Sequence, residues 1–308
     1  MVAHPLLNIH DWPEPLGENP EGDLVVTTFH GAQRPTGPLA EIMGRHEAKL
    51  HPRDRRVLNA YMDLDMDTFS RELARRVIEL LNEAEPDLRI RYLEFDAQRA
   101  ILDMNRAISF DARRKLWAPE HEEVWTELGG LHTELMEAFH ETVPQNAFDL
   151  ALDVHTMYPF SPILDQHQIQ AGQQTVYEKR GQLVRYINDY RLAEKRGGVQ
   201  RNWDFITRND EREYSNGDWV NEASHLLTET GISVVQNNPY NFGNKDLTGK
   251  RLMELTRRRG LTFDAPKNLF GAGKRLQKDY LPEHLDRGNL ENIARALAQS
   301  YLKVRTKA

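Results

Sequence analysis

Apolar residues follow two different spacings along the chain, which separates expected strands from expected helices. Residues 24–29 and 90–95 are rich in β-branched and aromatic side chains, as buried strands are. Residues 148–154 form a third apolar run, which ends at His155, and residues 232–235 form a fourth. These four runs predict strands of a central sheet.

Other segments repeat apolar residues every three or four positions, which is the period of an α-helix. Such stripes begin near Asp67 and end before Pro86, and they recur over residues 119–141, 219–230 and 290–301. Strands that alternate with helices are typical of α/β proteins. We therefore predict an α/β sandwich with a mostly parallel or mixed central sheet.

Two stretches lack either period. Residues 31–54 contain Pro35 and Pro38, and residues 194–219 are polar and rich in Arg, Asn and Asp. We expect both to be irregular excursions, the second a surface segment or a lid, because long irregular segments often carry function. Neither internal repeats nor a linker divide the chain, so we expect one domain over residues 1–308.

Composition narrows the class of protein. The 308 residues include 40 Lys and Arg against 47 Asp and Glu, which gives a net charge of −7. No apolar run approaches the roughly 20 residues that span a bilayer, and the N-terminus lacks the pattern of a secretory signal. The acidic balance argues against nucleic-acid binding. We expect a cytoplasmic protein that binds neither membranes nor nucleic acid, and homo-oligomer formation stays open.

The chain has no cysteine, so any metal must be held by His, Asp or Glu. Such residues follow the expected strands: His30 follows the first, and Asp153 and His155 end the third, while the acidic segment 63–67 precedes a helix. Ligands of open α/β sheets bind at the carboxyl ends of strands. Two imidazoles and a carboxylate there would suit zinc with an open position for water.

Each of these residues also has an ordinary structural interpretation. His30 alone could be a packing or surface histidine. Asp67 followed by Thr68 suits a helix N-cap, because carboxylates favour the positive end of a helix dipole, whereas Asp65 is explained less well in this way. The other histidines on expected helices lack a His-Glu-x-x-His pattern and are interpreted as surface or packing residues: His121, His132, His140 and His225.

Two further segments carry groups that bind anions or line loops. Arg106 beside Asn105 could grip a carboxylate, because a guanidinium is a planar fork and the amide adds a donor. Arg99 and Asp103 could instead pair with each other. Residues 237–243 are rich in Asn and aromatic side chains, which suits a loop at a site and equally an ordinary turn.

Taken in this order, the segments resemble the N-formylglutamate amidohydrolase (deformylase) family of zinc hydrolases. The resemblance spans residues 28–243 and rests on His30-Gly31, Asp63-Leu64-Asp65, Arg99-x-x-x-Asp103-x-Asn105-Arg106, Asp153-x-His155-Thr156-Met157, and the loop from Asn238 to Gly243. It implies a three-layer α/β/α sandwich related to the zinc carboxypeptidases, which is a hydrolase-like fold.

The resemblance also implies residue roles. One zinc ion per chain would be held by His30, Asp65 and His155. Arg106 with Asn105 would receive a carboxylate of the substrate.

Further roles follow from the same resemblance. Asp153 would orient a ligand or touch the substrate, and Asn238 would line the substrate site. Arg99 could stabilise the developing oxyanion. Glu254 is the nearest candidate for the catalytic glutamate of the family, as general base and then general acid.

This sequence departs from the family pattern at positions that face the substrate. Phe29 stands where the family usually has proline, and the loop after Asn238 lacks two adjacent glycines. The family places its catalytic glutamate in a Gln-x-Glu element on a strand. Glu254 lacks that glutamine and is followed by residues 257–259, all arginine, so a solvated helix is an equally good interpretation.

We therefore expect a zinc-dependent amidohydrolase that cleaves an N-formyl or N-acyl amino acid, a small molecule similar to N-formylglutamate. A carboxypeptidase-like metallopeptidase on the same scaffold is one alternative. A non-catalytic binding protein that retains the fold is another.

Overall fold

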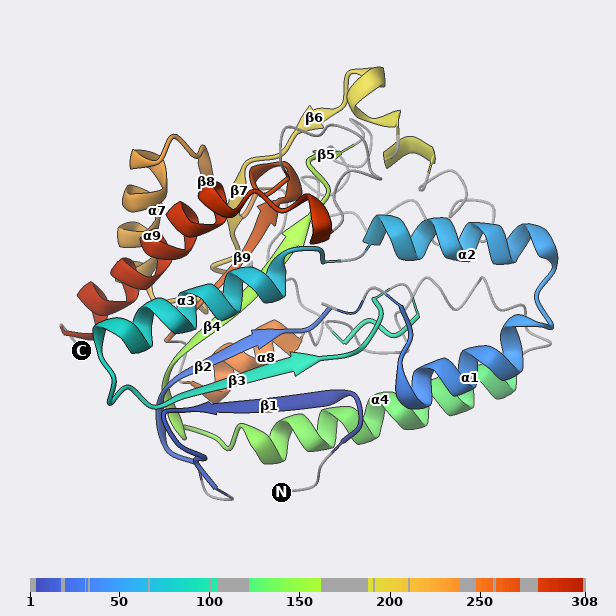
Figure 1. Ribbon diagram of the computed structural model, residues 1–308, viewed down its shortest axis with the longest axis horizontal. Coiled ribbons are helices and arrows are strands. Elements are labelled where there is room, and N and C mark those ends of the chain that lie inside the picture. The colour runs from blue at the N-terminus through green and yellow to red at the C-terminus, as the bar shows by residue number, and fades with distance from the viewer. Residues whose placement is uncertain are drawn as a thin grey trace.

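A computed structural model gives the fold of the chain (Figure 1). It describes residues 4–17, 20–30, 32, 34–65, 67–99, 101–104, 122–161, 188–190, 192–209, 211–238, 248–256, 259–271 and 282–306, without the side chains of residues 61, 63–65, 161 and 194. All statements below concern this part of the chain.

A mixed sheet of seven strands forms the centre of the fold, in the order β1-β3-β2-β4-β9-β7-β8. The strands are β1 (Leu7–Trp12), β2 (Gly22–Thr28), β3 (Ile90–Phe95), β4 (Phe148–Met157), β7 (Trp203–Phe205), β8 (Val234–Gln236) and β9 (Gly260–Pro266). The pairs β2–β3, β2–β4, β4–β9 and β7–β8 are parallel, and β1–β3 and β7–β9 are antiparallel. The expected mixed sheet is confirmed.

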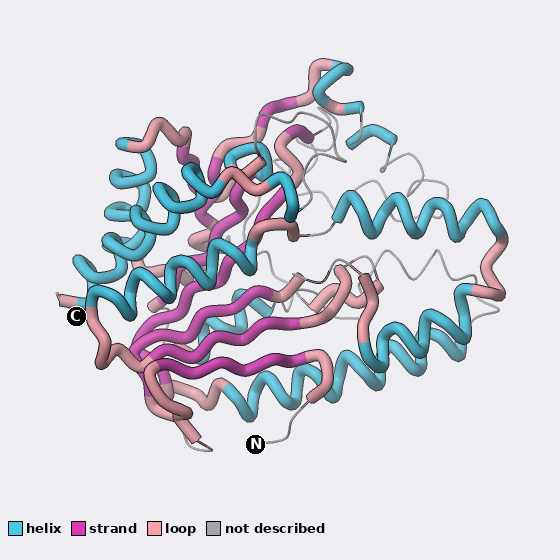
Figure 2. The backbone as a smooth tube through the Cα atoms, viewed as in Figure 1, coloured by secondary structure: helices cyan, strands magenta, loops and turns pink. Residues whose placement is uncertain are grey.

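Helices cover both faces of the sheet, which makes the three-layer sandwich that the resemblance implied (Figures 1 and 2). Helices α3 (Ser70–Ala84), α7 (Gly217–Glu229) and α9 (Arg287–Arg305) contribute to the apolar core on one face. Helices α1 (Gly37–Glu47), α4 (Glu122–Thr142) and α8 (Thr248–Leu255) contribute to the core on the other. No helix among the described residues is both long and apolar enough to cross a membrane.

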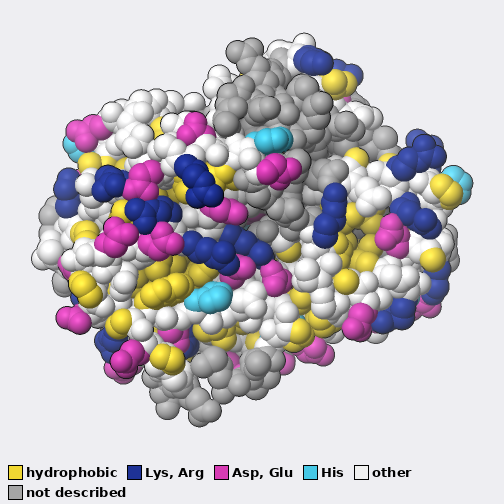
Figure 3. Space-filling model, viewed as in Figure 1, with side chains coloured by type: hydrophobic (Ala, Val, Ile, Leu, Met, Phe, Trp, Pro, Cys, Tyr) yellow, Lys and Arg dark blue, Asp and Glu magenta, His cyan; other side chains and the backbone are white. Residues whose placement is uncertain are grey.

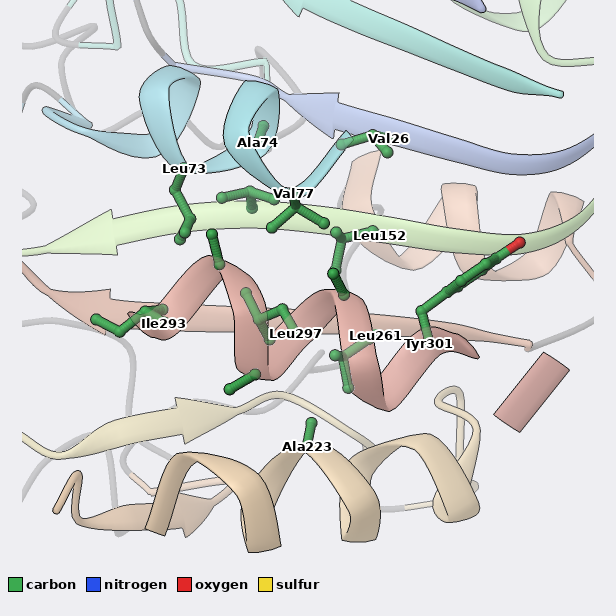
Figure 4. Packing of buried hydrophobic residues seen from close by; sticks show 14 of the residues in the cluster. Val26, Leu73, Ala74, Val77, Leu152, Ala223, Leu261, Ile293, Leu297 and Tyr301 are labelled. Carbon is green, nitrogen blue, oxygen red and sulfur yellow. The ribbon is translucent and has the colours of Figure 1, made fainter. Parts of the chain in front are cut away.

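Strand β4 shows why the sheet is buried on both faces. Leu150, Leu152 and Val154 belong to the core under α3 and α9, whereas Ala151 belongs to the core under α4. Successive side chains of a strand point to opposite faces, so a strand covered by helices on both faces is apolar at both kinds of position. Figure 4 shows Leu152 between Val77 of α3 and Leu297 of α9.

The surface over α3 and α9 carries charges of both signs (Figure 3). Arg76 of α3 bonds Glu291 of α9, with its Nε 2.6 Å from a carboxylate oxygen of Glu291, and reaches Glu79 and Glu83 on its own helix. Exposed ion pairs of this kind contribute little to stability. This face is therefore exposed to solvent, and the pair of Arg76 with Glu291 connects the two helices.

The expectation of irregular structure over residues 31–54 is wrong, since this stretch contains α1 and the start of α2 (Pro52–Asp65). Both helices have a proline in the first turn, Pro38 in α1 and Pro52 in α2. The first turn is where a missing N–H costs nothing, so these prolines mark helix starts rather than interruptions.

The expectation of an irregular excursion over residues 194–219 is also wrong in part. It contains a 3₁₀ turn (Glu194–Arg196), β6 (Val199–Gln200), which pairs with β5 (Phe160–Ser161), and β7, which joins the central sheet. Trp203 and Phe205 of β7 are fully buried. A strand of three residues is too short to produce a recognisable period. Two further 3₁₀ turns lie at Lys267–Leu269 and Pro282–His284.

Candidate active site

Polar side chains gather on one face of the sheet, at the carboxyl ends of its central strands. Thr27 on β2 and Asp153 and His155 on β4 alternate with residues of the other face, and β2 leads directly into His30. Asp264 on β9 is the register partner of His155. By alternation along the strands, Thr27, Asp153, His155 and Asp264 belong to the face that α4 covers, so the topology brings together residues more than 200 positions apart.

His155 is held between two carboxylates. Its Nδ1 lies 3.1 Å from an oxygen of Asp67, and its Nε2 lies 3.1 Å from an oxygen of Asp153. The hydroxyl of Thr27 donates a hydrogen bond of 2.9 Å to the other oxygen of Asp153. Burial lowers the pKa of His155, but Asp153 and Asp67 outweigh it and hold this pKa well above its usual value.

His30, the second histidine of this site, is also fully buried. Its ring centroid lies 5.5 Å from that of His155, and its Nε2 lies 3.2 Å from an oxygen of Asp103. Arg99 links the carboxylates around the two rings, with Nη1 3.4 Å from Asp67 and Nε 3.8 Å from Asp103. The rings of His30 and His155 are therefore neighbours at this edge of the sheet.

Asp67 does not cap a helix, as one interpretation of the sequence had it. Helix α3 begins at Ser70, and its N-cap is Phe69 with a φ of 77° and no side-chain cap bond. The carboxylate of Asp67 contacts His155 and Arg99 instead, and its backbone N–H donates to the carbonyl of His30 at 3.4 Å. The left-handed Phe69 separates Asp67 from the helix, which is a local geometry that residue spacing does not reveal.

Asp264 is a carboxylate that the sequence analysis missed. It is partly buried, and partial loss of water raises its pKa, against the opposing charges of His155 and Arg99. The available signal was Thr262-Phe263-Asp264, an acidic residue within an alternating apolar run. Asp264 therefore occupies the strand next to the one that carries His155.

The structure places Glu254 and Asn238 differently. Glu254 lies on α8 and pairs with Arg251 at 3.3 Å and with Arg212 at 4.0 Å. Asn238 follows β8, and its backbone N–H lies 3.1 Å from both carboxylate oxygens of Asp204, the register partner of Asp264. The turn at Asn238 is thereby tied to the strand next to Asp264.

Other predicted site residues lie wholly or partly outside the described residues. Asp65 is the last residue of α2, and its side chain is outside the description. Asn105, Arg106 and residues 239–243 are outside it altogether. Their predicted roles stay predictions.

The donors at this site fit zinc by type. Imidazole and carboxylate are ligands that zinc accepts, and the buried carboxylates of Asp67, Asp103 and Asp153 concentrate negative charge around His155 and His30. Among the described residues, no three His, Asp or Glu side chains surround one point as a metal ion requires. Both ring nitrogens of His155 bond carboxylates, so binding an ion there requires one of these bonds to be exchanged.

Similar proteins are found among solved structures. No protein-family model matches the chain, and no curated protein matches it in sequence. Matching solved structures include a gene product, Atu2144, from Agrobacterium tumefaciens (12% identity, 98% of this chain and 95% of that chain, TM-score 0.49) and a bacteriophage poly-gamma-glutamate hydrolase (8%, 100% and 94%, 0.42).

A further match is the N-formylglutamate amidohydrolase from Ralstonia eutropha JMP134. It is 14% identical, with 98% of this chain and 97% of that chain covered and a TM-score of 0.50. The likeness extends over nearly the full length of both chains. The chain therefore has the α/β fold of this N-formylglutamate amidohydrolase, which is the fold that the resemblance implied.

Proposed function

We propose that this protein is a zinc-dependent amidohydrolase that cleaves an N-formyl or N-acyl amino acid to the free amino acid and a carboxylate. The observation that carries the proposal is the convergence of His30, His155, Asp67 and Asp264 at one edge of the sheet. The shared fold with an N-formylglutamate amidohydrolase supports it.

His30, His155 and Asp67 would hold the ion. Asp67 takes the place that the sequence analysis gave to Asp65, because the carboxylate of Asp67 already contacts His155. When bound, zinc supplies Lewis-acid polarisation of the amide carbonyl and lowers the pKa of water.

Asp153 and Thr27 fix the ring of His155. Thr27 donates to one oxygen of Asp153, and Asp153 bonds His155. Carboxylates that orient histidine ligands in this way set the tautomer and raise the basicity of the ring.

Asp264 would carry the proton. As general base its carboxylate accepts a proton from the attacking water, and as general acid it then donates the proton to the leaving amine nitrogen. The raised pKa of Asp264, which follows from partial burial, brings its proton affinity closer to that of a catalyst at neutral pH. Asp264 thus takes the role predicted for Glu254, whose carboxylate pairs with Arg251 and Arg212.

The remaining groups bind and orient the substrate. Arg106 with Asn105 is proposed to hold the carboxylate of the amino acid, which would position the scissile bond. Arg99, whose guanidinium lies beside Asp67 and Asp103, would supply positive charge where the oxyanion develops.

A hydrolysis panel tests this function. The zinc-loaded protein is assayed on N-formyl and N-acetyl amino acids and on short peptides, with Asp264→Asn and Glu254→Gln as paired variants. We expect turnover of acyl amino acids that Asp264→Asn abolishes and Glu254→Gln spares. Preferential cleavage of peptides would favour a metallopeptidase. A zinc-loaded protein inert on the whole panel would favour a non-catalytic binding protein.

A further inference from the structure

Residues 67–69 lead into helix α3 and bond two segments that carry the histidines of the site. The backbone N–H of Asp67 donates to the carbonyl of His30, which follows β2, at 3.4 Å. The carbonyl of Thr68 accepts a hydrogen bond of 2.6 Å from the hydroxyl of Thr156 on β4. The backbone on both sides of the Asp67 side chain is therefore attached to these segments.

Thr156 reaches this turn from the face of the sheet opposite to the candidate site. It follows His155 directly on β4, and successive side chains of a strand point to opposite faces. Thr156 is 1% exposed, and both residues lie in the part of β4 that pairs with β9. The bond from the hydroxyl therefore fixes the backbone of Thr68 relative to the backbone of His155.

Phe69 gives the turn a backbone conformation that its surroundings must maintain. Its φ of 77° lies in the left-handed region, which is unfavourable for a residue with a Cβ and persists only where neighbouring contacts determine it. Phe69 is 1% exposed, and its ring centroid lies 5.9 Å from that of Phe270. The hydroxyl of Ser70 also donates to the carbonyl of Asp67 at 2.9 Å. These contacts use the backbone and the apolar ring, and not the carboxylate of Asp67.

The turn thereby directs the carboxylate of Asp67 to one nitrogen of His155. That carboxylate lies 3.1 Å from Nδ1 of His155, while Nε2 bonds Asp153, to which Thr27 donates. Each nitrogen of the ring is thus bonded to a carboxylate, and a different threonine restrains each carboxylate. Thr27 does so directly, whereas Thr156 does so through the backbone of the turn.

We propose that Thr156 is a positioning residue of the candidate site, which acts through the carbonyl of Thr68 to hold Asp67 at Nδ1 of His155. The inference rests on the proposed function, in which Asp67 and His155 hold one zinc ion. Residues that orient metal ligands without touching the ion typically contribute about 10- to 100-fold to metal affinity. Thr156 contributes this affinity from the opposite face of the sheet.

Nitrogen NMR of the metal-free protein tests the positioning without turnover. Protein labelled at its histidine nitrogens gives Nδ1 and Nε2 resonances for His155, which are assigned by their loss in His155→Gln. Thr156→Val removes the hydroxyl but keeps the branched shape. We expect it to shift the Nδ1 resonance, which reports on Asp67, more than the Nε2 resonance. Thr27→Val should show the reverse, because Thr27 restrains the carboxylate at Nε2.

Zinc affinity is the second readout, measured in competition with a chromophoric chelator. Thr156→Val should bind zinc about 10- to 100-fold more weakly than wild type, and Thr156→Ser, which keeps the hydroxyl, should recover most of this loss. Thr142→Val is the matched control, since Thr142 is also buried and its hydroxyl donates to the carbonyl of Ala138 at 2.7 Å within α4. It should leave zinc affinity and the resonances of His155 unchanged.

Ser70→Ala keeps the inference testable even if Thr156→Val fails to fold. It removes the other hydroxyl that holds the turn, the one that donates to the carbonyl of Asp67. This variant should likewise shift the Nδ1 resonance of His155 more than the Nε2 resonance.

Unchanged zinc affinity in folded Thr156→Val would overturn the positioning role. Equal shifts of the two resonances in that variant, or equal or absent shifts in Ser70→Ala, would overturn it as well, because they would show no particular effect on Asp67. The proposed function fails separately, when zinc-loaded wild type hydrolyses no acyl amino acid.

Discussion

His155 and Asp264 occupy register positions on the neighbouring parallel strands β4 and β9, on one face of the sheet. The two strands are adjacent in space but more than 100 residues apart in sequence. This pairing puts a carboxylate with a raised pKa beside a histidine held by Asp67 and Asp153. The proposed proton carrier and a proposed metal ligand thereby lie on adjacent strands of the sheet.

Asp264→Asn should lower kcat by about 10²- to 10⁴-fold, the usual contribution of general acid-base catalysis. Asp149→Asn, at the exposed start of β4, is the control and should leave kcat unchanged. Steady-state kinetics of the zinc-loaded proteins measure both. Full activity of Asp264→Asn would exclude Asp264 as the proton carrier.

The same substitution should raise stability. The pKa of Asp264 is higher in the folded protein than the unfolded value of about 3.9, so the unfolded state loses its proton first. Stability therefore falls as pH rises from the unfolded pKa through the folded one, and this cost is present above the unfolded pKa. Metal-free Asp264→Asn should melt at a higher temperature than metal-free wild type at pH 7. A lower melting temperature would contradict the direction of the shift.

Paired variants test whether Asp67 or Asp65 binds the metal. Asp67→Asn should remove metal binding, because the carboxylate beside His155 is lost, whereas Asp65→Asn should retain it. Elemental analysis of both purified variants decides between them. Zinc retained by Asp67→Asn and lost by Asp65→Asn would restore the original sequence prediction.

Thr27→Val tests whether the hydrogen bond from Thr27 to Asp153 helps to position the ring of His155. Loss of the bond to Asp153 should cost about 1 kcal/mol in the free energy of unfolding and lower zinc affinity about 10- to 100-fold. Thr28→Val is a matched control on the same strand, since Thr28 bonds Tyr92 at 3.0 Å on the other face. It should destabilise the protein to a similar extent with zinc affinity unchanged. Equal zinc affinities of the two variants would argue against the role of Thr27.

Leu297→Ala should destabilise the protein by about 2–5 kcal/mol, because Leu297 is fully buried between α9 and the sheet. The exposed Gln299 on the same helix provides the control, and Gln299→Ala should change stability by less than about 0.5 kcal/mol. Urea denaturation of the two variants gives both values. A small loss for Leu297→Ala would mean that α9 packs loosely on the sheet.

Much of the fold could be predicted from periodicity, and the failures have physical causes. The long strand β4 and the helices α3, α4, α7 and α9 were predicted because each presents an apolar face over many residues. Helix α1 was missed because Pro35 and Pro38 were taken to interrupt structure. Strand β7 was missed because three residues carry no period.

Some residues of the candidate site could likewise be predicted from the sequence, and others could not. His30 and His155 were predicted as site residues because each follows an apolar run of the sequence, and strand ends converge. Asp67 could not be distinguished from a helix cap, because the left-handed φ of Phe69 turns the chain between Asp67 and α3. To predict Asp264 as a site residue, one would have to recognise β9 as a strand and know its register with β4. That register is a tertiary property.

The central claim is that His30, His155 and Asp67 hold one zinc ion. The most direct test is the zinc content of purified protein, measured by elemental analysis after dialysis, for wild type, His30→Ala, His155→Ala and the exposed control His225→Ala. The account predicts one zinc per chain in wild type and His225→Ala and none in the other two. Stoichiometric zinc in His155→Ala, or none in wild type supplied with zinc, would contradict it.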